Sequence, residues 1–186
     1  MAVRGRVVNV DFSKKSDLAY IKGVLCGDGW TYNNKKTWKY NVGLGCKDKE
    51  FALKFKASLE KIGLRMWFGY DEKHGWRTIG NSKLLYLWNE NTNYDGFKTK
   101  KEITSFLEGF YESDGTSSLT NIQYCNTNKA LLLATKKYLD VFDIETTLQG
   151  PYKNNHNSTY YFLRVKSKYI NKFKTLINPI NKFNKK

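Results

Sequence analysis

One short phrase occurs twice in this chain and constrains its fold more than any other feature. The first copy, DLAYIKGVLCGDG, closes with Asp28 before its last glycine, and the second, SFLEGFYESDG, closes with Asp114. Each copy is a short apolar segment with small residues four positions apart, and each ends in Asp-Gly. A chain whose halves share such a phrase can fold as two similar units about a pseudo-twofold axis. That arrangement would bring one carboxylate from each half together.

The repetition extends beyond the phrase. Residues 47–68 (KDKEFALKFKASLEKIGLRMWF) align with residues 127–148 (TNKALLLATKKYLDVFDIETTL), and leucines fall at matching positions. The connection that precedes this segment is longer in the first half, and loops absorb such differences whereas packed elements do not. The sequence therefore predicts a first repeat at 1–90, a linker at 91–99 and a second repeat at 100–186.

Hydrophobic periodicity predicts an α+β fold in which each half reads helix, hairpin, helix, hairpin, helix, that is, two αββαββα repeats with antiparallel sheets. In the first half, Ser16 or Asp17, Asp48 and Ser82 are the expected N-caps. Counted with their caps, the expected helices are 16–26, 48–62, 82–89, one that ends at 113, 128–141 and 167–177. The expected strands are 30–32, 38–45, 64–68, 76–79, 117–119, 122–125, 144–149 and 160–166.

Composition limits the class of partner. The chain has 32 Lys+Arg against 17 Asp+Glu, a net charge of +15, which raises its affinity for polyanions. No run approaches the roughly 20 apolar residues of a membrane span, and residues 1–17 lack the apolar stretch of a signal peptide. The three cysteines fit neither a disulfide framework nor a zinc site. We expect a protein that is not secreted, resides in a prokaryotic cytoplasm or an organelle, and binds no membrane.

The small residues of the two phrases predict a close helix pair. Gly23 and Gly27 lie on one helix face, and Gly109 and Ser113 match them in the second copy. Small residues at this spacing let two helix backbones approach closely, whereas large side chains hold helix axes about 8–10 Å apart. Glycine costs about 1 kcal/mol in a helix interior, so two in one short helix indicate a packing role.

Each predicted helix then delivers an aspartate at its C-terminal end, where the partial negative charge of the helix disfavours an acid. Two such acids at one seam repel each other, which raises one pKa or attracts a divalent cation, and hard cations such as Mg²⁺ take oxygen ligands. Asp-Gly is also a common turn signal, which would explain a single copy. Duplication with matched small residues favours a shared site. Glu112 is expected at a packing or solvent position, without a catalytic role.

These phrases resemble the motif of the LAGLIDADG homing endonucleases, in the single-chain form that fuses two repeats, and the resemblance covers nearly the whole chain. It implies that a saddle of β-strands binds a long, nearly asymmetric DNA duplex and that both strands are cut across the minor groove, leaving cohesive 3′ ends. It also implies a requirement for Mg²⁺ or another hard divalent cation. On this resemblance Asp28 and Asp114 are the metal-binding catalytic acids, with the backbone carbonyls of Gly27 and Ser113 beside them.

The same resemblance places polar residues near the metals. Lys47 is expected to offset charge on the scissile phosphate, and Asn126 holds a position where the family often has Gln or Asn. Cys46, the counterpart of Asn126, departs from that pattern. Because Thr127 replaces the partner of Lys47, the two strand cuts are expected to proceed at unequal rates; Lys83 and Lys168 are weaker matches.

Base recognition is expected from polar side chains on one face of the strands, and phosphate contacts from scattered lysines. A polar strand face has a simpler explanation, because antiparallel sheets commonly have one solvated side. The net charge and the paired acids favour nucleic acid. The expected DNA-binding residues are Tyr32, Lys35, Lys36, Lys39, Asn41, Arg77, Gln123, Gln149, Lys153, Arg164 and Lys166.

Two alternatives remain open. An intron maturase would fold RNA on the same scaffold with weak or no cleavage, and intron RNA would then be a partner; gel-shift competition between intron RNA and duplex DNA separates the two functions. A basic ribosome-associated α/β protein leaves the duplicated acids without a purpose. The resemblance to the two-repeat form implies a monomer.

Overall fold

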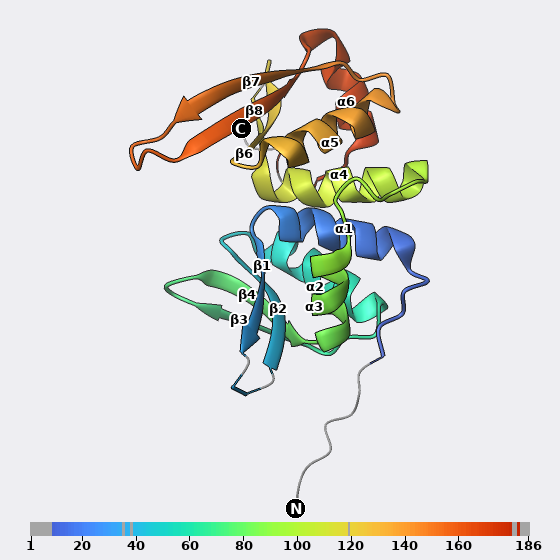
Figure 1. Ribbon diagram of the computed structural model, residues 1–186, viewed down its shortest axis with the longest axis vertical. Helices are drawn as coiled ribbons and strands as arrows, with labels where there is room; N and C mark the ends of the chain where they lie inside the picture. The colour runs from blue at the N-terminus through green and yellow to red at the C-terminus, as the bar shows by residue number, and fades with distance from the viewer. Residues whose placement is uncertain (1–8, 35, 38, 119, 180–181, 183–186) are drawn as a thin grey trace, which may run out of the picture.

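A computed structural model describes residues 9–34, 36–37, 39–118, 120–179 and 182 of the chain, and Figure 1 shows two similar αββαββα units stacked on each other. The first unit consists of α1 (Lys15–Cys26), β1 (Gly29–Asn34), β2 (Lys39–Cys46), α2 (Lys49–Lys61), β3 (Met66–Asp71), β4 (Gly75–Asn81) and α3 (Lys83–Asn91). The second consists of α4 (Lys100–Asp114), β5 (Gly115–Ser117), β6 (Ile122–Asn126), α5 (Lys129–Asp140), β7 (Thr146–Lys153), β8 (Thr159–Val165), the 3₁₀ turn η1 (Ser167–Tyr169) and α6 (Ile170–Leu176). The predicted fold class and the duplication are confirmed.

Side-chain caps fix where most helices begin. Asp48 accepts hydrogen bonds from the backbone N–H groups of the first turn of α2, and Ser82 does the same for α3, as predicted. Thr99 forms a capping box with Glu102 at the start of α4. The predicted cap of α1 is wrong: the helix begins at Lys15, and Lys14 at the N-cap makes no side-chain capping bond.

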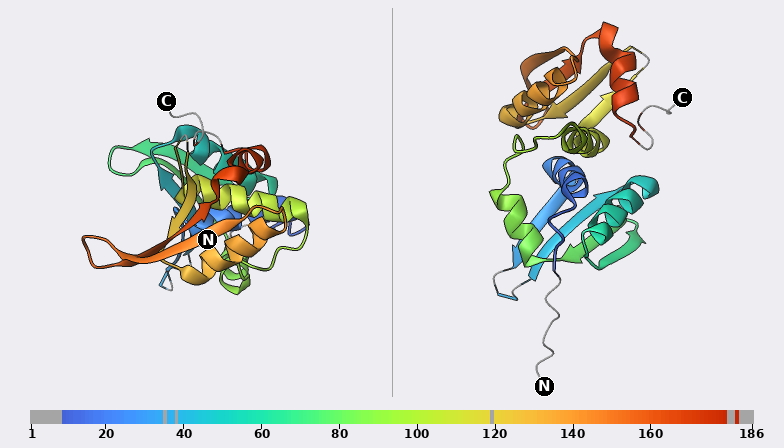
Figure 2. Two further views of the ribbon diagram at one scale, coloured as in Figure 1. Left: turned by 90° about the horizontal axis from the view of Figure 1, so that it is seen from above. Right: turned by 90° about the vertical axis from the view of Figure 1, so that its right-hand side faces the viewer.

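Both sheets are antiparallel and have equivalent strand orders, β1-β2-β4-β3 and β5-β6-β8-β7. One face of each sheet is covered by the helices of its own repeat, as Figure 2 shows. Val42 and Leu44 of β2 are fully buried on that face of the first sheet, and Tyr124 and Leu163 are fully buried in the second. The alternate residues on the same strands therefore lie on the opposite face, which we call the open face.

Several predicted elements differ from the observed ones, and β3 covers Met66–Asp71 instead of 64–68. β5 begins directly after Asp114 at Gly115 instead of at 117, and Leu119 lies outside the described residues, as does Trp38 at the predicted start of β2. β7 continues past the predicted end at 149, because a bulge between Gln149 and Tyr152 absorbs Gly150 and Pro151. The last predicted helix is a 3₁₀ turn followed by the shorter α6.

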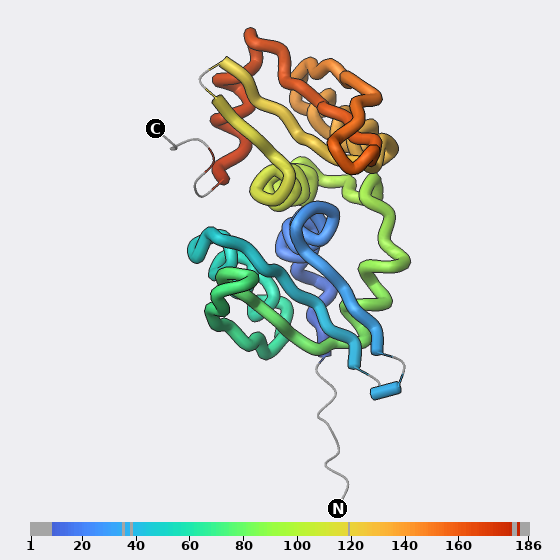
Figure 3. The backbone as a smooth tube through the Cα atoms, turned by 90° about the vertical axis from the view of Figure 1, so that its left-hand side faces the viewer, coloured from blue at the N-terminus to red at the C-terminus, as the bar shows by residue number. Residues whose placement is uncertain are grey.

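The two repeats meet through α1 and α4, which lie side by side at the centre of the molecule (Figures 1 and 3). A Cβ atom added at Gly23 would overlap the carbonyl oxygen of Phe106, and one added at Gly109 would overlap the carbonyl oxygen of Tyr20. Backbone therefore touches backbone at both positions, which confirms the close helix pair predicted from the small residues. None of the helices in the described part of the chain has the length and apolar character needed to cross a bilayer.

We expect Gly23→Ala to lower the free energy of unfolding by about 3 kcal/mol, the upper end of the cost of overpacking a core. Without the backbone contact, Gly23→Ala should stabilise the protein, because alanine is the better helix former by about 1 kcal/mol. A loss of stability therefore reports the contact. Gly45→Ala is the control: its added Cβ would lie 3.7 Å from the carbonyl oxygen of His74, an ordinary contact. Urea unfolding measures both variants, and equal stability would contradict a backbone contact at Gly23.

Candidate metal and nucleic-acid site

The ends of the two motif helices meet, which brings the two predicted acids to one place. A Cβ added at Gly27 would overlap the Cβ of Ser113 and would lie 3.0 Å from Oδ1 of Asp114. Asp28 follows Gly27, so both acids lie at the same end of the helix seam. The proximity has an electrostatic consequence, because the charge of Asp28 raises the pKa of Asp114.

Burial is the main reason that the Asp114 carboxyl is hard to ionise, and it raises the pKa of that group to about 6. A hydrogen bond from the side-chain amide of Asn126 and the charge of Lys182 act in the opposite direction. The side chain of Asp28 is exposed, yet desolvation by its surroundings raises its pKa too, again opposed by Lys182. The two acids therefore share one electrostatic environment.

Lys182, near the C-terminal end of the chain, lies beside the acids although the sequence did not indicate it. Its ammonium donates hydrogen bonds to the backbone carbonyls of Ser113 (3.0 Å) and Gly115 (2.6 Å), on either side of Asp114. The hydroxyl of Ser117 donates a hydrogen bond to the backbone carbonyl of Lys182. No local pattern distinguishes this lysine from its neighbours in the tail, so only tertiary structure identifies it.

This group of atoms suits a hard cation. It offers carboxylate oxygens from Asp28 and Asp114 and the carbonyl of Ser113, all of the ligand type that Mg²⁺ prefers. A positive charge, the Lys182 ammonium, already lies against that carbonyl. Among the described residues, no group of three or more His, Cys, Asp or Glu side chains could hold a metal, so a cation here would need backbone oxygens, water or substrate as further ligands.

The two halves of the site are chemically unequal. Asn126 donates from its amide to the carboxylate of Asp114 and, at 3.5 Å, to the carbonyl of Cys26. Its counterpart Cys46 instead donates its thiol to the carbonyl of Asp48 at 3.1 Å, within its own repeat. Asp114 therefore has an amide partner from the strand β6, and the equivalent strand of the first repeat supplies no such group to Asp28. The side chain of Lys47 is exposed at the end of β2.

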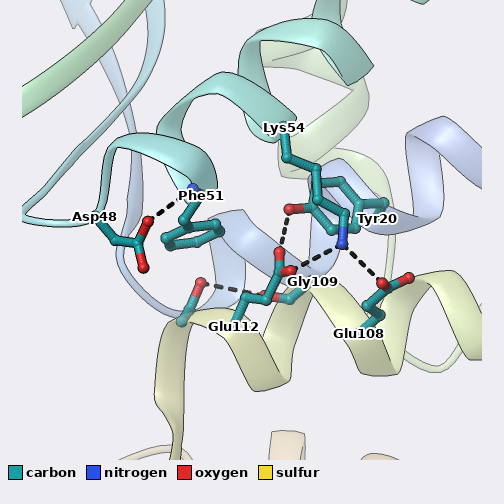
Figure 4. A network of polar contacts seen from close by, with 8 residues as sticks. Tyr20, Asp48, Phe51, Lys54, Glu108, Gly109 and Glu112 are labelled. Atoms are coloured by element: carbon teal, nitrogen blue, oxygen red, sulfur yellow. Dashed lines mark hydrogen bonds and ion pairs between the residues drawn. The ribbon is translucent and has the colours of Figure 1, made fainter. Parts of the chain in front are cut away.

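Glu112 lies in a buried network that holds the motif helices in register (Figure 4). Its carboxylate accepts hydrogen bonds from the hydroxyl of Tyr20 on α1 and from the ammonium of Lys54 on α2, the latter at 2.8 Å. Lys54 also pairs with Glu108 at 2.7 Å and lies over the Tyr20 ring. Glu112 is 4% exposed, so of the packing and solvent positions expected for it the packing position is the one observed, with a charged partner that the sequence did not predict.

The open faces of both sheets carry most of the predicted DNA-binding side chains. Strand register places Tyr32, Lys39, Asn41 and Arg77 on the open face of the first sheet and Gln123, Gln149 and Arg164 on that of the second. The rings of Trp30 and Trp67 also lie on the first open face, over Gly43 and Gly69. Neither tryptophan is among the DNA-binding residues predicted from the sequence.

The remaining predicted DNA-binding lysines lie elsewhere. Lys36 is in the β1–β2 turn, and Lys153 ends β7 on the face opposite to Tyr152. Lys166 follows β8 and pairs with Glu145 at 2.6 Å. Lys35 lies outside the described residues. Of the two weaker lysine matches, Lys168 also pairs with Glu145, at 3.0 Å.

Comparison with known proteins gives a family for part of the chain. Residues 101–178 match the model of the LAGLIDADG-like domain. Uncharacterized protein MJ0398 of Methanocaldococcus jannaschii is 31% identical over 163 residues, which cover 82% of this chain and 60% of that protein. A second uncharacterized protein of the same organism is 29% identical over 81% of this chain and 64% of its own length. The chain thus spans about three fifths of the length of these curated relatives.

Homing endonuclease I-DmoI of Desulfurococcus mucosus is 23% identical over 79% of each chain. The crystal structure of I-DmoI in complex with DNA and Mn superimposes with a TM-score of 0.73, at 20% identity, over 88% of this chain and 97% of that one. The N-terminal LAGLIDADG domain of DUF199/WhiA gives a TM-score of 0.64, at 17% identity, over 96% of this chain and 91% of that domain. The structures share the two-repeat fold.

We expect Lys54→Met to lower the free energy of unfolding by about 3 kcal/mol, because the buried Glu112 carboxyl would lose the ammonium group that faces it. Lys56→Met is the control on the same helix, since its pair with the half-exposed Glu60 should contribute no more than about 0.5 kcal/mol. Urea unfolding compares them. Similar small losses in both variants would show that the network does not hold the helices together.

We expect Lys182→Met to raise the pKa of Asp114 above its value of about 6, because the variant removes a charge that lowers it. A cation needs the ionised carboxylate, so affinity for Mn²⁺ should fall as pH drops below about 6 in the wild type and at a higher pH in the variant. Lys172→Met removes an equal charge from an exposed pair with Asp143 and is the control. Carboxyl ¹³C shifts follow the titration; an unchanged Asp114 curve would place Lys182 away from the acids.

Proposed function

We propose that the chain, whose second repeat matches the LAGLIDADG-like domain, is a site-specific DNA endonuclease, an intron-encoded homing enzyme that makes a double-strand break. Its target would be a long asymmetric duplex, cut to leave cohesive 3′ ends, and one monomer would contact both halves of it. The observation that carries this proposal is the position of Asp28 and Asp114 together at one end of the α1–α4 seam. The name of I-DmoI, a homing endonuclease, supports it.

The residues that would hold the divalent cation are Asp28 and Asp114, with the carbonyls of Gly27 and Ser113. When bound, Mg²⁺ or another hard divalent cation supplies Lewis acidity to the scissile phosphate and the leaving 3′ oxygen. Both carboxyls resist ionisation in the free protein, so the site takes up a cation at the expense of protons.

The neighbouring side chains position and balance charge. Asn126 fixes the orientation of Asp114 through its amide, while Asp28 lacks a matching partner from Cys46. Lys47 offsets charge on the scissile phosphate from the first half, where the second half has Thr127. Lys182 supplies a further positive charge beside the acids. Because the two halves differ in these groups, the two strands are cut at unequal rates.

Recognition of the target would use the open faces. Arginine and lysine suit guanine edges, and asparagine and glutamine suit adenine, so Arg77 and Arg164 read guanine while Asn41 and Gln123 read adenine in the major groove. The excess of positive charge provides the phosphate contacts that set register and make binding dependent on salt. Lysines at strand ends and turns, such as Lys36 and Lys153, serve this purpose.

We expect Asp28→Asn and Asp114→Asn each to reduce cleavage of a selected target by more than about 100-fold. Loss of a residue that only hydrogen-bonds to a metal ligand already costs about 10–100-fold in activity, and these changes remove the ligands themselves. Each change removes a negative charge beside the DNA, so binding should be retained. Asp140→Asn, at an exposed ion pair on α5, is the control. Cleavage is measured as the conversion of supercoiled plasmid that carries the selected target to linear plasmid, and binding is measured by gel shift. Retained cutting by both variants would remove the role of the acids.

The same gel shift separates the endonuclease from an RNA-folding protein. Duplex DNA that carries the selected site should compete at least as well as intron RNA for the wild-type chain. Preferential displacement of the duplex by intron RNA would overturn the proposal in favour of a maturase.

A further inference from the structure

Three aromatic rings gather on the open face of the β7–β8 hairpin. Tyr152 lies opposite Tyr160, and Phe162 lies opposite Gln149 two residues along β8, so register places all three rings on one face. Their ring centroids are 5.8 Å (Tyr152–Tyr160), 5.7 Å (Tyr152–Phe162) and 5.4 Å (Tyr160–Phe162) apart. Tyr152 is 42% exposed. We call these residues the aromatic triad.

In the equivalent hairpin of the first repeat, the Trp67 ring lies on the open face, but the aromatic cluster lies on the other face. Phe68 and Tyr70 of β3 contact the Trp76 ring of β4, and Phe68 lies opposite Thr78, whose hydroxyl donates to the carbonyl of Ala52 on α2. That cluster therefore lies on the helix side of its sheet. Cross-strand aromatic pairs stabilise a hairpin on either face, so stability alone does not explain why the second repeat places its rings on the open face.

The groups around the aromatic triad have the chemistry of a base-reading surface. Gln149 and Arg164 lie on the same open face, and Gln123 lies opposite Arg164 on the neighbouring strand. Their amide and guanidinium groups suit the polar edges of bases, and the chain as a whole carries a net charge of +15 that attracts a polyanion. A duplex that lies along these polar groups would bring its base edges against the rings.

Only one apolar group is present on base edges in the major groove, the C5-methyl group of thymine. We propose that the aromatic triad of Tyr152, Tyr160 and Phe162 reads thymine methyl groups in the half of the DNA target that faces the second repeat. This inference rests on the proposed function and adds a specificity determinant to it. A second copy of the chain against the rings is the competing occupant, and it lacks the charge complementarity that DNA has.

The test uses the wild-type chain and uracil substitution, which removes only the methyl group. Sites bound by the chain are selected from a randomised duplex library in the absence of divalent metal, and each thymine of the selected site is then replaced singly by uracil. At one or more positions in one half of the site, affinity should fall about fourfold, the change expected for one buried methyl group. Equal affinity for thymine and uracil at every position, with tight binding retained, would overturn the inference and leave DNA binding intact.

Variants identify the side chains responsible. Phe162→Ser and Tyr152→Ser should abolish the thymine–uracil ratio at those positions, whatever they do to overall affinity. Tyr70→Ser is the matched control, since it truncates a 60% exposed aromatic residue on the helix side of the equivalent hairpin and should preserve the ratio. A ratio unchanged by both triad variants would overturn the assignment, as would a chain that sedimentation shows to dimerise through the rings. Failure to bind any selected duplex would instead overturn the proposed function.

Discussion

The backbone contact between α1 and α4 is the constraint on which the rest of the molecule depends. Gly23 and Gly109 leave no side chain between the helices, so the axes approach closely and the helix ends arrive together at Gly27 and Ser113. That approach sets the position of both acids, of the two sheets and of their open faces. A single larger residue in the seam would separate the acids as well as the repeats, because both depend on the same contact.

Much of this could be predicted from the sequence, because the decisive signals are local. The small residues of the repeated phrase, the side-chain caps at Asp48 and Ser82, and alternation along β2 each indicate their own element. What could not be predicted depends on contacts between distant segments. Lys182 reaches Ser113 across 69 residues of sequence and Lys54 reaches Glu112 across 58, and neither pair has a sequence pattern. The full length of β7 could not be predicted either, because Gly and Pro usually end a strand, and only pairing with β8 shows that the strand continues beyond Gly150 and Pro151.

The two repeats share a backbone plan and differ in chemistry. Asn126 contacts its acid, whereas Cys46 bonds within its own repeat. The aromatic triad of the second hairpin lies on the open face, and the cluster of Phe68, Tyr70 and Trp76 in the first lies on the helix side of its sheet. Asn126 and Cys46 lie at strand ends and the aromatic triad lies on an open face, where packing does not restrict side-chain type, so these groups can differ while the fold stays unchanged. Each half can therefore acquire its own contacts while the seam stays constant.

The buried network around Glu112 also decides which halves can pair. Glu112 corresponds to Cys26 in the first phrase, and Lys54 corresponds to Ala134 in the aligned helices. Two second repeats packed against each other would bury two glutamates with no lysine to neutralise them, and two first repeats would leave Lys54 without a carboxylate. Burial of an unpaired charge is costly. When neighbouring chains fold at the same time, this asymmetry disfavours the pairing of like halves.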